Sequence, residues 1–92
     1  GGQSNTICNS NHSSIVGGTT NTLSGSCGFI GGGNCNIIKS SHSNSAITTS
    51  SITSISSNML HATSLYLKTL PTSDPGVPGV LYRSGCDVKI SV

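Results

Sequence analysis

Three segments near the start of the chain share one pattern: Gly1-Gly2-Gln3-Ser4-Asn5-Thr6-Ile7, Gly17-Gly18-Thr19-Thr20-Asn21-Thr22-Leu23 and Gly32-Gly33-Asn34-Cys35-Asn36-Ile37-Ile38. The Gly-Gly pair and the Asn-x-apolar triplet recur with steps of 16 and 15 residues. A fixed period of this kind is typical of chains whose successive coils stack on one another. The sequence therefore predicts a parallel β-roll or β-solenoid with coils of about 15–16 residues.

A second, weaker unit lies between these segments, at residues 13–16, 28–31 and 45–48. Both units carry an apolar residue, and these recur every seven to nine positions: Ile7, Ile15, Leu23, Ile30, Ile38, Ile47 and Ile55. We therefore expect two short strands in each coil, with the recurring apolar side chain pointing inward. The pattern decays from Thr48 onward, and the sequence predicts a last coil that turns into a transition segment.

The composition supports an ordered but thin β-structure. Ser, Thr, Asn and Gly supply 49 of the 92 residues, Glu is absent and Ala occurs twice, so helix is disfavoured throughout. One inward apolar residue per half-coil does not offset a backbone entropy of about 1–2 kcal/mol for each ordered residue. Disulfides, a longer parent chain or several chains sharing one core could each supply the missing stability. Because the chain begins inside a repeat, we expect it to be a piece of something longer.

The sequence changes character after residue 57. Alternation over residues 65–68 predicts a half-buried strand, and Asp74-Pro75-Gly76 and Val77-Pro78-Gly79 predict successive turns. A hairpin is predicted from a strand at residues 80–82, a tight turn at Ser84-Gly85 and a final strand with Val88, Ile90 and Val92. The chain thus divides into a β-roll repeat region at residues 1–57 and a C-terminal strand and hairpin cap at residues 58–92.

The repeat, with its Ser-rich half followed by Gly-Gly and Asn-x-Ile, resembles the head repeats of trimeric autotransporter adhesins and the related repeats of phage and giant-virus fibres. The tail from Leu70 to Tyr82, with Gly85 and Val88-Lys89-Ile90-Ser91 after it, looks like the C-terminal segment of viral tail-fibre proteins. The resemblance implies a parallel homotrimer with left-handed coils. The chain departs from the adhesin pattern in its scarce alanine and in its three repeat cysteines.

The sequence predicts no enzyme, no cofactor and no catalytic or metal-binding residue. Asp74 and Asp87 are the only carboxylates, and both fall in predicted turns, where Asp is common for structural reasons. Ser and Thr are too frequent to single out a nucleophile, and no Gly-x-Ser-x-Gly motif occurs.

The four cysteines, Cys8, Cys27, Cys35 and Cys86, lack Cys-x-x-Cys spacing and fall in different registers of the repeat. This disfavours a disulfide ladder and favours small side chains that fill gaps, while the disulfide state stays open. His12, Cys27 and His42 fall at similar distances after Asn5, Asn21 and Asn36. Three copies of a histidine on a threefold axis could hold an ion, and the alternative is polar residues on an outer strand.

The repeat architecture together with the resemblance to viral fibres predicts a structural fibre protein, the distal segment of a virion fibre or tail fibre that contacts the host surface. The alternative is the head domain of a trimeric cell-surface adhesin. An ice-binding array is disfavoured, because Thr20 is matched by Ser4 and Cys35 in the other coils. Expected partners are two further copies of the chain, other fibre or virion proteins and a host-surface glycan or protein. No basic cluster and no long apolar run points to nucleic acid or a membrane span.

Overall fold

The computed structural model describes residues 1–92 and contains only β-structure, without a helix. Accordingly, it has no helix with the length and apolar character of a membrane span. The strands are β1 (Thr6–Ile7), β2 (Ser14–Ile15), β3 (Thr22–Leu23), β4 (Phe29–Ile30), β5 (Ile37–Ile38), β6 (Ser45–Ile47), β7 (Met59–His61), β8 (Leu81–Ser84) and β9 (Asp87–Ile90).

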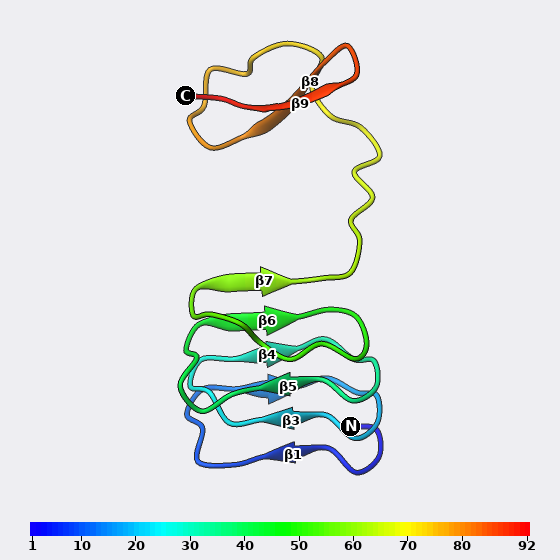
Figure 1. Cartoon of the computed structure of the whole chain (residues 1–92), viewed down its shortest axis with the longest axis vertical. Coiled ribbons are helices and arrows are strands. Elements are labelled where there is room, and N and C mark those ends of the chain that lie inside the picture. Colours follow the sequence, from blue (N-terminus) through cyan, green and yellow to red (C-terminus); the bar gives the residue numbers. More distant parts are fainter.

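The first seven strands form two parallel sheets between which the chain alternates (Figure 1). One sheet has the order β1-β3-β5 and the other the order β2-β4-β6-β7. In the first sheet Thr6 pairs with Thr22, and Thr22 pairs with Ile37, so each winding of the chain equals one period of the sequence. A further bridge joins Ile37 to Thr53, and β7 extends the second sheet to His61, past the boundary predicted at residue 57.

The core between the two sheets contains four fully buried apolar side chains, Leu23, Ile30, Ile38 and Ile47, and Ile15 and Ile52 pack against them. All four were predicted to point inward. Ile7 is 46% exposed, because β1 has a neighbouring strand on one side only. The prediction for Ile55 is wrong: Ser54 follows Ile38 in register, so the alternation turns Ile55 outward, where it is 74% exposed.

Side-chain amides connect the windings. The Oδ1 of each repeat asparagine accepts the backbone N–H of the equivalent residue one winding later: Asn21 to Asn5 (3.0 Å), Asn36 to Asn21 (3.0 Å) and Ile52 to Asn36 (3.1 Å). We call this series the asparagine ladder. Asn21 and Asn36 are fully buried, so each of these bonds satisfies a group that water cannot reach.

The Nδ2 groups of the ladder bind the glycine corners. Asn21 Nδ2 donates to the carbonyl of Gly17 in its own winding (3.2 Å) and to that of Gly33 in the next (3.0 Å). The corner must be glycine for steric reasons as well. Gly18 has a φ of +85°, and a Cβ there would collide with the carbonyl oxygen of Gly33. Asparagine and Gly-Gly therefore recur together at the close approach of two windings, while the amide bond itself needs only a carbonyl, as Asn36 shows by donating to Thr49.

The C-terminal part differs from the prediction in three places. Residues 65–68 form no strand, since no neighbouring strand offers them hydrogen bonds, and Leu65 is 70% exposed. The turn of the β8–β9 hairpin lies at Gly85-Cys86, one residue later than predicted, because Ser84 pairs with Asp87. Asp87 therefore begins β9 instead of lying in a turn.

The hairpin lies beyond the end of the stacked windings and is joined to β7 by an extended connector (Figure 1). It pairs with neither parallel sheet. Within one chain the hairpin therefore leaves the outer edge of β7 uncovered.

Replacing Asn21 with Ala should lower the free energy of unfolding by about 3 kcal/mol or more, because the buried N–H of Asn36 and the corner carbonyls lose their partners. Circular dichroism during denaturation measures the loss. Asn34→Ala is the matched control, since Asn34 lies in the following repeat, beside Asn36, but is exposed. Equal stability of the two variants would contradict the role of the ladder.

Candidate functional site

The two carboxylates have different structural settings. Asp74 precedes the hairpin, and its Oδ1 accepts the backbone N–H of Gly76 (2.8 Å) and the hydroxyl of Ser91 (2.7 Å). These bonds, that of Ser91 first, hold the pKa of Asp74 below its ordinary value because both donors favour the carboxylate. Asp74 thus joins a turn to the end of β9, as its predicted turn position implies.

A serine–histidine contact occurs inside the stack. The Oγ of Ser54 lies 2.7 Å from His42 Nδ1 and accepts the backbone N–H of Lys39 at 2.9 Å. The tautomer of His42 sets whether the hydroxyl or the imidazole donates this bond. Ser54 is 1% exposed, so no substrate could reach the hydroxyl. The pair fixes the loop at residues 39–43 against the following winding, and serine is too frequent in this chain for its sequence to single out the contact.

The predicted equivalence of His12, Cys27 and His42 is wrong for His42. His12 and Cys27 occupy equivalent left-handed corners with φ of 55° and 54°, and Asn44 takes this position in the next winding. His42 precedes it by two residues, because the loop at residues 39–43 lengthens that winding. No three His, Cys, Asp or Glu side chains come together as a possible metal site within the chain.

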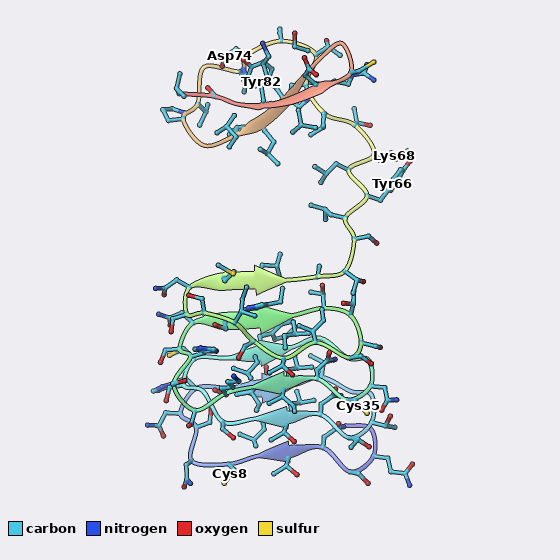
Figure 2. The ribbon with its side chains drawn as sticks, viewed as in Figure 1. Cys8, Cys35, Tyr66, Lys68, Asp74 and Tyr82 are labelled. Carbon is cyan, nitrogen blue, oxygen red and sulfur yellow. The ribbon has the colours of Figure 1, made fainter.

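The gap-filling interpretation of the cysteines is also wrong. All four are free and exposed. Cys8 follows the inward Ile7 and therefore points outward, Cys27 and Cys35 occupy left-handed corners, and Cys86 lies in the hairpin turn. Figure 2 shows Cys8 and Cys35 at the periphery of the stack.

His61 is the histidine with a defined interior position. It pairs in register with Ile47, so it continues a column of the core, and it is 7% exposed. Its Nδ1 lies 3.1 Å from the carbonyl oxygen of Ala46, and its Nε2 accepts the backbone N–H of Ile55 at 3.2 Å. These partners select the neutral tautomer with hydrogen on Nδ1.

Together, Ser54, His61 and Ile52 end the stack from within. Ser54 replaces an apolar residue in one core column, His61 does so in the other, and Ile52 lacks the amide that would continue the asparagine ladder. Both core columns thus finish in hydrogen-bonded polar groups.

A shallow hollow of about 220 Å³ lies between the connector and the hairpin. Six residues line it, namely Leu67, Lys68, Thr69, Leu70, Thr72 and Arg83. It offers two cations and no carboxylate, but its side chains are largely exposed, so salt screens any attraction for an anion.

The most prominent surface feature of the molecule is its exposed apolar side chains. Fifteen large apolar or aromatic side chains are exposed, and no apolar side chain after Ile47 is fully buried. The accessible surface is 5814 Å², whereas a compact monomer of this mass exposes about 4,900 Å². The single chain therefore has a larger total surface than a compact monomer of its mass, and fifteen large apolar side chains contribute to it.

Replacing His61 with Leu should lower the free energy of unfolding by about 1–3 kcal/mol, because the N–H of Ile55 loses its acceptor. In the unmodified protein, nitrogen NMR at pH 7.5 should detect hydrogen on Nδ1 of His61 and none on Nε2. The opposite tautomer would contradict the assigned bonds.

Acid should loosen the hairpin segment through Asp74. The pKa of Asp74 is lower in the folded than in the unfolded chain, so its stabilisation is present above the unfolded value and is lost as pH falls through the folded value. Below about pH 4 the amide NMR signals of Gly76 and Ser91 should shift together. In Asp74→Asn this shared transition should be absent; its persistence would assign the effect to another group.

Comparison of the chain with family models, curated proteins and solved structures finds no match. Its function is therefore inferred from its own residues and geometry.

Proposed function

We propose that the chain is a structural fibre segment, the distal part of a virion fibre or tail fibre that projects from the particle and contacts the host surface. The observation that carries this proposal is the asparagine ladder. The buried amides Asn21 and Asn36 are occupied in bonding one winding to the next. In such a chain the buried side-chain hydrogen bonds join successive windings and so extend the stack.

In this proposal the two parallel sheets are the sides of a β-solenoid. The register of 15–16 residues per winding supports this, because sequence period and strand pairing coincide. The chain measures 44 × 21 × 19 Å, with the strands stacked along the long axis (Figure 1). Length in such a stack grows with the number of repeats, which suits a projecting fibre.

Three parallel copies form the proposed assembly. Four fully buried apolar residues are too few for 92 ordered ones, and no disulfide adds stability. The uncovered apolar side chains supply the missing contacts if copies pack against one another. The hairpin supports the same conclusion, since a lone two-stranded hairpin is marginal in water.

The adhesin alternative uses the same stack on a cell surface. Immunogold labelling of the source material with antibody against residues 1–92 distinguishes the virion fibre from the cell-surface adhesin. Gold on projections of virus particles supports the fibre, whereas gold confined to cell envelopes supports the adhesin.

The chain should sediment as a trimer at micromolar concentration, and its melting temperature should rise with protein concentration, because folding and association are coupled. Analytical ultracentrifugation and circular dichroism measure both. A folded monomer whose melting does not depend on concentration would sink the assembly part of the proposal.

A further inference from the structure

The outer face of the β2-β4-β6-β7 sheet has a column of one serine and three apolar residues. Ile15, Ile30, Ile47 and His61 point inward on these strands, so their preceding neighbours point outward. These outward neighbours are Ser14, Phe29, Ala46 and Leu60, and we call them the Phe29 face. Phe29 is 41% exposed and Leu60 is 61% exposed.

Gly31 makes this face flat. A Cβ at Gly31 would lie 3.2 Å from Cε2 of the Phe29 ring, so the ring lies along the sheet above this glycine. The aromatic ring thus lies along the sheet over Gly31, and Val16, level with Gly31 on the neighbouring strand, adds a further exposed apolar side chain. A flat apolar face fits another flat face better than it fits a narrow ligand.

Charge distinguishes this face from that of the other sheet. The outer side of β1-β3-β5 carries Thr6, Thr22 and Ile37, and Lys39 follows the inward Ile38 there. Symmetric copies packed through that side would bring their Lys39 side chains together. The Phe29 face has no charged residue, so it can meet its own copy without repulsion.

The amount of exposed surface also fits contact with another copy of the chain. The chain exposes about 900 Å² more than a compact monomer of its mass. A standard interface covers about 800 Å² on each partner. The excess, to which the exposed connector at residues 62–69 contributes, is comparable in size with one such interface.

The connector and the hairpin indicate that neighbouring copies run in the same direction. Leu65 and Leu67 on the connector and Val88 and Ile90 on the hairpin are exposed in the single chain. Copies running in the same direction would place connector beside connector and hairpin beside hairpin. Antiparallel copies would leave these segments at opposite ends.

From these observations we infer that the Phe29 face is the subunit interface, occupied by the same face of parallel copies around an axis along the stack. The inference rests on the proposed trimer and adds the surface through which it forms. The β1-β3-β5 side then faces outward.

Substitution of two matched residues tests the inference. Phe29 and Ile37 are 41% and 42% exposed, lie on β4 and β5, and point outward from opposite sheets. Phe29→Asp should raise the concentration of half-dissociation in ultracentrifugation at least tenfold. Ile37→Asp should change it less than twofold. The reverse order would overturn the inference.

Spin labels give a readout in an otherwise intact interface. With the four exposed natural cysteines replaced by Ser, one label is placed at Ser14→Cys on β2 and, separately, at Thr6→Cys on β1. Electron–electron distances between copies should be below the 21 Å width of the chain at Ser14 and above it at Thr6.

The outcomes separate the two proposals. A trimer with the shorter distance at Thr6 overturns the Phe29 face and leaves the assembly standing. A monomer by ultracentrifugation overturns both. A trimer with the shorter distance at Ser14 and the expected response to Phe29→Asp supports both.

Discussion

The fold depends on one contact, the bond from a buried asparagine Oδ1 to the backbone N–H one winding further on. It places the windings in register, and the Nδ2 of the same side chain fixes the glycine corner in two windings at once. A core of few apolar side chains is sufficient here because the register of the windings is set by the asparagine hydrogen bonds. In a larger protein, side-chain packing sets such a register. The apolar columns fill the remaining space between the sheets.

Much of the repeat region could be predicted from the sequence. Leu23, Ile30, Ile38 and Ile47 are buried as expected, because the same alternation that spaces them sets the strand register. His42 was misplaced because counting from asparagine assumes corners of equal length, and one loop is longer. Ser54 and His61 were not recognised as interior residues, since polar side chains become acceptable in a core only through partners distant in sequence. Residues 65–68 alternate like a strand, but they run away from the sheets and no strand lies beside them.

The surface is divided by function in the assembly we propose. The Phe29 face would be turned to the axis, whereas the threonine-bearing side and the left-handed corners would face the medium. The exposed cysteines lie largely at these corners and in the hairpin turn, outside the asparagine ladder. Exposed corner residues such as Cys27 and Cys35 therefore set what the outside of the stack presents, whereas the glycine corners belong to the contacts that hold the windings together.

The stacking also determines how the segment responds to force. Hydrogen bonds between windings run along the long axis, so tension between the two ends of a chain pulls directly on them (Figure 1). Under such tension we expect the bonds between windings to break one winding at a time, because each winding pairs only with its neighbours in the stack. Each released winding of 15–16 residues lengthens the chain by up to about 50 Å. A tether built from such windings would yield stepwise and stay attached while it absorbs a sudden pull.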